Sequence, residues 1–115
     1  MMKLFPLFAL SFIIILSTAC SKHKVSTLTN PNCTDSVYYS TQIKPMMDTY
    51  CLSCHGVGNS TAYTITDHSN TSSNATNILK AMRGELQLMP QNGPALNDSL
   101  IQQFNCWINQ GKLNN

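Results

Sequence analysis

Apolar residues recur at helical spacing in a short stretch near the middle of the chain. Ile43, Met46, Met47 and Tyr50 stand at positions i, i+3, i+4 and i+7, which places them on one face of an α-helix. Pro45 would break a helix interior, but it is tolerated in a first turn, where its missing N–H has no partner to lose. The pattern therefore predicts a helix that begins near Ile43 and buries Met46 and Met47.

A longer apolar stripe lies in the last fifth of the sequence. A good N-cap precedes it, either Asn97 or Asp98, and Gly111 follows it, as is favoured just beyond a helix C-terminus. We expect a helix between these signals. Its apolar face consists of Leu100, Ile101, Phe104, Trp107 and Ile108.

The residues between these two helices divide into two loops around a short helical stretch. Residues 56–77 are rich in Ser, Thr, Asn and Gly, and they predict a long loop anchored on the core through Tyr63 and Ile65. Residues 77–83 have helical spacing that stops before Gly84. Residues 86–96 contain two prolines and a glycine, which predict an irregular loop.

The N-terminal region has the pattern of an export signal. Lys3 precedes an apolar run over residues 4–16, and small residues then lead to Cys20. The run is shorter than the ~20 residues that a membrane-spanning helix requires. A small-residue run that ends in cysteine is similar to a bacterial lipobox, in which the cysteine is acylated, although Ser17 stands where leucine is most common. An ordinary secretory signal that leaves Cys20 as a thiol is the alternative.

These features predict three segments: a lipoprotein signal peptide at residues 1–19, a lipid-anchored flexible tether at 20–32, and one folded domain at 33–115. The 115 residues carry a formal charge of +2. A chain so close to neutral has no basic patch that would bind nucleic acid and no run of basic residues that would bind lipid headgroups. We therefore expect membrane association through the acyl chains on Cys20, on the periplasmic side of a bacterial membrane.

The candidate chemistry lies directly after the first predicted helix, in the run Cys51-Leu52-Ser53-Cys54-His55. In an exported protein, a C-x-x-C-H run predicts a site for covalent attachment of c-type haem. Two thiols at this spacing can each form a thioether to one haem vinyl group. The adjacent histidine then supplies the proximal axial nitrogen to the iron.

Other uses of these side chains stay open. Cys51, Cys54 and His55 could bind zinc together with a remote Cys33 or Cys106. A thioredoxin-like redox pair would require a βαβ setting that the pattern does not show. A simple disulfide or free thiols are the remaining alternatives.

The five cysteines also indicate a disulfide. With Cys20 assigned to the anchor and Cys51 and Cys54 to the motif, Cys33 and Cys106 remain. An even remainder in an oxidising compartment predicts a bond between them, joining the segment before the first helix to the last helix. The alternative is that Cys106 is a plain buried apolar residue.

Three motifs in order resemble class I (mitochondrial-type) cytochromes c, and most closely the small planctomycete-type bacterial cytochrome c domains. The family opens with I-x-P-[IL]-L before C-x-x-C-H, continues with an M-P-x-x-G-P-x-L turn and ends with a helix that reads W-I-x-x-G. The matching positions are residues 43–47, 51–55, 89–96 and 107–111. The resemblance covers residues 33–115, and it implies an all-α fold of three to four helices around one covalently bound haem.

The resemblance further implies that His55 is the proximal ligand and Met89 the sixth ligand of the iron. Met82 is the rival among the methionines, although its spacing places it in the core. His68 is a further alternative, for which we favour a surface position instead. We also expect Arg83 on the solvated surface, with pairing to a haem propionate as the other possibility.

The function expected from these features is one-electron transfer by a monohaem c-type cytochrome. Its partner would be another redox protein, with no small-molecule substrate and no catalytic residues. The alternatives are a haem-based peroxidase or a gas or redox sensor with a labile sixth ligand, and a zinc-binding lipoprotein without haem.

Overall fold

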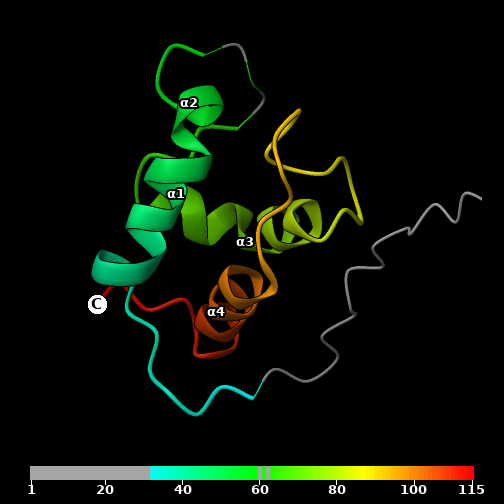
Figure 1. Ribbon diagram of the computed structural model, residues 1–115. Coiled ribbons are helices and arrows are strands. Elements are labelled where there is room, and N and C mark those ends of the chain that lie inside the picture. The colour runs from blue at the N-terminus through cyan, green and yellow to red at the C-terminus, as the bar shows by residue number, and fades with distance from the viewer. Residues whose placement is uncertain (1–31, 60, 62) are drawn as a thin grey trace, which may run out of the picture.

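Four α-helices and one π-helical turn make up the regular structure in the computed structural model, which describes residues 32–59, 61 and 63–115 (Figure 1). No strand occurs within those ranges, so the predicted all-helical architecture is confirmed. The elements are η1 (Tyr39–Ile43), α1 (Lys44–Tyr50), α2 (Leu52–His55), α3 (His68–Met82) and α4 (Asp98–Asn109).

The predicted signal peptide, the acylation site Cys20 and all but the last residue of the predicted tether lie outside the described residues. Within the described ranges, no helix is both long enough and apolar enough to cross a bilayer.

The first helix begins almost where the pattern predicted, with a π-helical turn ahead of it. The N–H of Lys44 bonds to the carbonyl of Tyr39, and that of Ile43 to the carbonyl of Tyr38 at 3.3 Å. The next residue is Pro45, which has no backbone N–H. The change from π-helical to α-helical geometry therefore leaves no unpaired donor at that position. Met46 and Met47 are buried as predicted.

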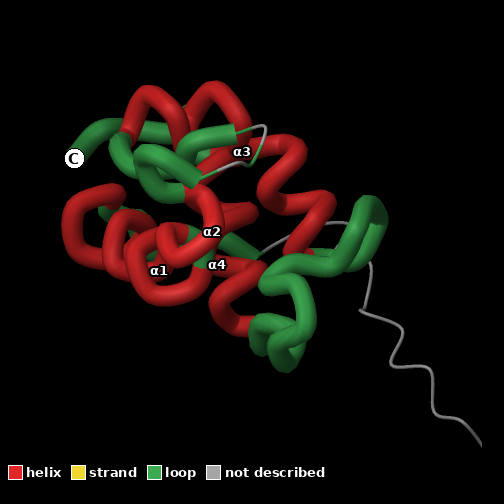
Figure 2. The backbone as a smooth tube through the Cα atoms, turned by 90° about the horizontal axis from the view of Figure 1, so that it is seen from above, coloured by secondary structure: helices red, strands yellow, loops and turns green. Residues whose placement is uncertain are grey.

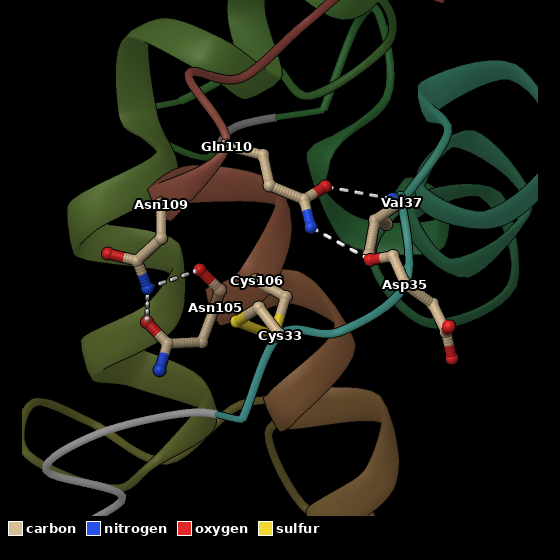
Figure 3. The surroundings of a disulfide bond; sticks show 7 residues. All are labelled: Cys33, Asp35, Val37, Asn105, Cys106, Asn109 and Gln110. Carbon is tan, nitrogen blue, oxygen red and sulfur yellow. Dashed lines mark hydrogen bonds between the residues drawn. A yellow bond between two sulfur atoms is a disulfide. The ribbon is translucent and has the colours of Figure 1, made fainter.

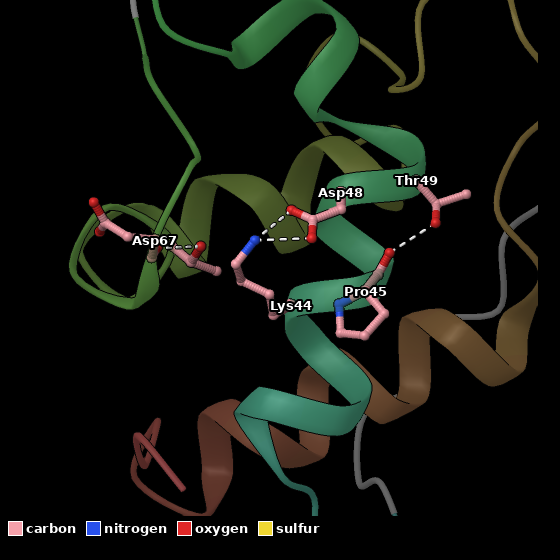
Figure 4. Close-up of polar contacts among 6 residues, drawn as sticks. Lys44, Pro45, Asp48, Thr49 and Asp67 are labelled. Carbon is pink, nitrogen blue, oxygen red and sulfur yellow. Dashed lines mark hydrogen bonds and ion pairs between the residues drawn. The ribbon is translucent and has the colours of Figure 1, made fainter.

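The exposed face of α1 is polar. Lys44 pairs with Asp48 at 2.7 Å, and the hydroxyl of Thr49 donates to the carbonyl of Pro45 at 2.7 Å (Figure 4). Both interactions join residues four apart, which is the spacing of neighbours on a helix surface. The ion pair leaves Lys44 and Asp48 on the solvent side of α1.

The prediction that residues 56–77 form a loop is wrong for its second half, because α3 already begins at His68. Asp67 caps the helix by accepting from the N–H of Asn70 at 2.9 Å. The N-terminal turns bury only Thr71 and Ala75. Because one of these residues is polar and the other small, the apolar period does not become visible in the sequence until Ile78.

The last helix agrees with its prediction at both ends. Asn97 is the N-cap and accepts from the N–H of Leu100 at 2.9 Å, and Gly111 follows the helix with a φ of +94°. Helix α4 packs against α3 and against η1, and Figure 2 shows the four helices from above. Phe104 and Trp107 are fully buried there, and the indole N–H of Trp107 donates to the carbonyl of Leu113 at 2.9 Å.

The predicted disulfide joins Cys33 to Cys106, with the two Cα atoms 5.4 Å apart (Figure 3). It holds residues 32–38, here called the N-terminal strap, against α4. The side chain of Gln110 adds two hydrogen bonds to the strap. Its amide N–H donates to the carbonyl of Asp35 at 2.8 Å, and its amide oxygen accepts from the N–H of Val37 at 2.8 Å. The strap is thereby fixed to the helix by one covalent and two polar links.

Candidate cofactor site

The C-x-x-C-H residues consist of Cys51, at the junction of α1 and α2, and of the single helical turn of α2 itself. Cys51 is the residue between the two helices, and its carbonyl accepts from the N–H of Cys54 at 3.2 Å and from the N–H of His55 at 2.8 Å. Positions i, i+3 and i+4 share one face of a helix. The backbone therefore directs both thiols and the imidazole to the same side, and neither thiol is in a disulfide.

That side faces a cavity of about 280 Å³ with mostly apolar walls. Cys51, Cys54 and His55 form one wall. The other walls come from the C-terminal half of α3 and from the loop at residues 86–96. Those walls include Ile78, Ala81, Met82, Leu86, Met89, Pro90 and Leu96.

A wider hollow of about 420 Å³ adjoins this cavity, and the two share Tyr50, Ser53, Pro90 and Leu96. Cofactor pockets commonly measure roughly 300–1,000 Å³ and are lined mainly by apolar side chains. The cavity and its neighbour together have the size and the apolar walls that a large flat cofactor requires.

The ring of His55 is oriented by the loop that follows α2. Its Nδ1 lies 2.8 Å from the carbonyl oxygen of Tyr63. Because a carbonyl can only accept, Nδ1 carries the proton and Nε2 keeps its lone pair. A hydrogen bond from the second ring nitrogen to a carbonyl is the usual arrangement of a metal-ligating histidine. The site thus presents Nε2 as a ready donor to a metal.

The same loop also satisfies the carbonyl groups of the motif. Thr61 donates from its hydroxyl to the carbonyl of Cys54 at 3.1 Å, and Asn59 donates from its amide to the carbonyl of Ser53 at 3.2 Å. The sequence indicated only a polar loop here and missed the role of Thr61 and of the Tyr63 carbonyl. A backbone carbonyl carries no sequence signal, so the Tyr63 contact could not have been found from the residue pattern.

Met89 lines the same cavity as the motif, on the loop between α3 and α4. Its N–H donates to the carbonyl of Ala81 at 3.1 Å, which ties this part of the loop to the end of α3. Met82 also lines the cavity but is buried in the core, whereas Met89 is only half-buried. The structure therefore brings both candidate methionines to the site, and the choice of Met89 stays a prediction.

His68 is not among the cavity residues. Its Nε2 lies 2.8 Å from the carbonyl oxygen of Lys112, and its ring meets Tyr39 edge-on with 4.9 Å between centroids. It is half-buried at the first position of α3 rather than on the surface as we predicted. These contacts give it a structural role beside Tyr39 and Trp107.

Comparison of the chain with protein families, curated proteins and solved structures gives no match. The function proposed below therefore rests on the residues of this site.

Both cysteines of the site are free, as covalent attachment through sulfur requires. Burial is the main cause that raises the pKa of Cys51 to about 11, and the interaction with neighbouring Cys54 contributes in the same direction. Cys51 is consequently a neutral thiol at neutral pH. A thiol adds across a vinyl double bond by breaking S–H and forming C–S and C–H bonds, so the attachment requires no oxidant.

The donors for the zinc alternative are not assembled. Cys33 and Cys106 are bonded to each other, so neither can complete a tetrahedral set with Cys51, Cys54 and His55. Within the described ranges, no three His, Cys, Asp or Glu side chains are grouped closely enough to hold a metal ion. One histidine nitrogen and a methionine sulfur in one apolar cavity fit a haem iron, whose remaining four donors come from the macrocycle.

Arg83 is mostly buried, contrary to the expectation that it lies on the solvated surface. Its side chain is 14% exposed and contacts Glu85 at 3.7 Å. Its Nε and Nη2 are buried without a hydrogen-bond partner among the described residues. Burying the N–H groups of a guanidinium without hydrogen-bond partners lowers the stability of the folded state. A cofactor carboxylate within reach of these groups would remove that cost.

Proposed function

We propose that the protein is a monohaem c-type cytochrome that carries one electron between partner proteins. The observation that carries this proposal is the shared cavity. The two thiols and the imidazole of the motif form one wall of it, a methionine sulfur is available in it, and the Tyr63 carbonyl orients His55 for metal ligation. The proposed fold is that of a class I cytochrome c.

Each site residue has one role in this proposal. Cys51 and Cys54 hold haem c through thioether bonds, His55 donates from Nε2 to the iron, and Met89 supplies the sixth ligand. The haem contributes a one-electron couple between Fe(II) and Fe(III). If His55 and Met89 both bind the iron, no coordination position would be open to a substrate, and the proposed activity is outer-sphere transfer without catalysis.

The surroundings of the site favour the reduced state. A thioether ligand stabilises ferrous haem relative to a second imidazole. The apolar walls formed by Ile78, Met82 and Leu96 act in the same direction, because they disfavour the extra positive charge of ferric haem. We therefore propose a carrier with a relatively high reduction potential.

The proposed location is the periplasmic face of a bacterial membrane, with acylated Cys20 as the anchor. The sequence of the N-terminal segment supports export, and the Cys33–Cys106 disulfide agrees with an oxidising compartment. The proposed partners are other redox proteins in that compartment.

The double variant Cys51→Ala/Cys54→Ala tests the attachment. When the protein is produced in a host that attaches c-type haem, the wild type should retain its haem after denaturation and extraction with acidified solvent. The variant should lose all of it, because only thioether bonds survive that treatment. The measurement is the haem absorbance that stays with the protein.

The control is Cys33→Ser/Cys106→Ser, which removes the same number of sulfur atoms away from the cavity and should keep its haem through the same extraction. Haem that is equally extractable from the wild type and from the double alanine variant would disprove covalent attachment. A wild type that contains zinc and no iron would replace this proposal with the zinc-binding alternative.

A further inference from the structure

One dipeptide in the loop at residues 86–96 combines two residues that react with each other. Asn92 is followed by Gly93, and it is the only asparagine in the sequence that glycine follows. The side-chain amide of an asparagine is open to attack by the backbone nitrogen of the next residue, and a glycine there has no Cβ to hinder the approach. Asparagine is among the thermolabile residues of proteins. The sequence therefore distinguishes Asn92 from every other asparagine.

The structure leaves the side chain of Asn92 without protection. Asn92 is exposed and lies in the loop between α3 and α4. Hydrogen bonds to neighbouring groups hold the side chains of Asn59, Asn74, Asn97 and Asn109, whereas no such bond within the described ranges reaches the side chain of Asn92. Its amide is therefore free to rotate toward the backbone that follows it.

The backbone nitrogen of Gly93 is only weakly engaged. Its N–H donates to the carbonyl of Pro90 at 3.4 Å and closes a tight turn over residues 90–93. Good N–H···O bonds are shorter, at about 2.7–3.2 Å. The ends of the turn are fixed independently, since the N–H of Met89 bonds to α3 and Leu96 is buried in the core. The turn can therefore open locally while the fold around it stays intact.

We propose that Asn92 is a site of spontaneous covalent modification, at which the side-chain amide is replaced by a carboxylate. The nitrogen of Gly93 forms a bond to Cγ of Asn92, the bond from Cγ to the amide nitrogen breaks, and ammonia leaves with the proton of the Gly93 N–H. Water then adds to either carbonyl of the resulting five-membered imide. Addition at Cγ gives aspartate, and addition at the backbone carbonyl gives isoaspartate, in which the chain runs through the side chain. The reaction consumes water, releases ammonia and requires no oxidant or enzyme.

The position of Asn92 connects this modification with the cofactor site. Gln91 lines the cavity, and Pro94 lines the adjoining hollow. The new carboxylate adds a negative charge to the loop between them, and a negative charge close to the iron stabilises its ferric form. This consequence rests on the function proposed above, whereas the modification itself does not.

The purified, folded protein is the material for the test. It is kept in mildly alkaline buffer at room temperature, sampled over several weeks and digested, and the peptides are analysed by mass spectrometry and by isoaspartyl methyltransferase labelling. Modification at Asn92 should be faster by about tenfold or more than at Asn114, which is also exposed but is followed by a residue with a Cβ. Equal rates at the two positions would overturn the proposal. Modification of Asn92 only after unfolding in urea would overturn it as well, because the folded turn would then protect the amide.

Two variants separate the chemistry from the general mobility of the loop. A Cβ at position 93 would lie 3.5 Å from the Cβ of Pro90, an ordinary contact, and Gly93 has no positive φ, so Gly93→Ala should fold. It should slow the modification by about tenfold or more, because the Cβ hinders the approach of the nitrogen. Asn92→Gly keeps the turn, since glycine readily adopts the φ of +60° found there, and it should show no modification in the same peptide. A wild-type rate in Gly93→Ala would contradict the proposed reaction.

The reduction potential tests the consequence for the cofactor. Asn92→Asp carries the carboxylate of the product, so its haem form should have a lower potential than that of Asn92→Gly. Equal potentials would show that the charge does not reach the cofactor and would overturn this consequence. A protein without haem would fail in its visible spectrum but would still give the peptide analysis. Failure of the proposed function and failure of the modification site are therefore separate results.

Discussion

Replacing Met89 with alanine should lower the reduction potential of the protein by about 0.1 V or more, within the roughly 0.8 V range over which axial ligands set haem potentials. The thioether of Met89 is the proposed donor that stabilises the reduced iron. Without it, the sixth position is open to water, so the variant should also bind carbon monoxide at neutral pH when reduced. Potentiometric titration followed by absorbance measures the first effect, and a carbon monoxide difference spectrum measures the second.

The matched control for Met89→Ala is Met82→Leu. Both methionines line the cavity, but Met82 is buried at the end of α3 and packs in the core. The leucine preserves its volume, so it should cost less than about 1.5 kcal/mol of stability and leave the potential near the wild-type value. A potential that is unchanged in Met89→Ala but lowered in Met82→Leu would make Met82 the ligand. Carbon monoxide binding by the wild type at neutral pH would favour a sensor or peroxidase instead.

Removing the disulfide by Cys33→Ser/Cys106→Ser should lower the free energy of unfolding by about 4 kcal/mol. The bond closes a loop with a sequence separation of 73, so the loss of chain entropy that it imposes on the unfolded state is large. This is a large share of the roughly 5–15 kcal/mol that stabilises a typical domain. Urea-induced unfolding followed by circular dichroism measures it.

The control for the disulfide is Gln110→Ala. This substitution removes the two hydrogen bonds to Asp35 and Val37 but keeps the covalent link between the strap and α4. Two such bonds contribute about 2 kcal/mol together, so the variant should be clearly more stable than the one without the disulfide. If the double serine variant loses less than about 1 kcal/mol, the disulfide contributes little to the fold.

The parts of the site that depend on local spacing could be predicted from the sequence. The C-x-x-C-H residues face one cavity because positions i, i+3 and i+4 share a helix face, which any short helix there would produce. The pairing of Cys33 with Cys106 followed from counting cysteines in an exported chain. The ends of α4 followed from Asn97 and Gly111, whose preferences for those positions are strong.

The parts that depend on packing between distant segments could not be predicted. The first turns of α3 bury Thr71 and Ala75, and such a face gives no apolar period to detect. Arg83 is buried by tertiary packing, although its position near a loop indicated the surface. His68 is held by Tyr39 and by the carbonyl of Lys112, which are far from it in sequence. The Tyr63 carbonyl that orients His55 is a backbone group, and its placement depends on the path of the whole loop.

The visible spectrum of the purified mature protein, oxidised and then reduced with dithionite, tests the central claim most directly. Covalent haem with His55 and Met89 as ligands predicts sharp c-type bands on reduction and a weak far-red sulfur-to-iron band in the oxidised form. A protein without haem bands would contradict the proposed function and return Cys51 and Cys54 to the status of thiols or zinc ligands.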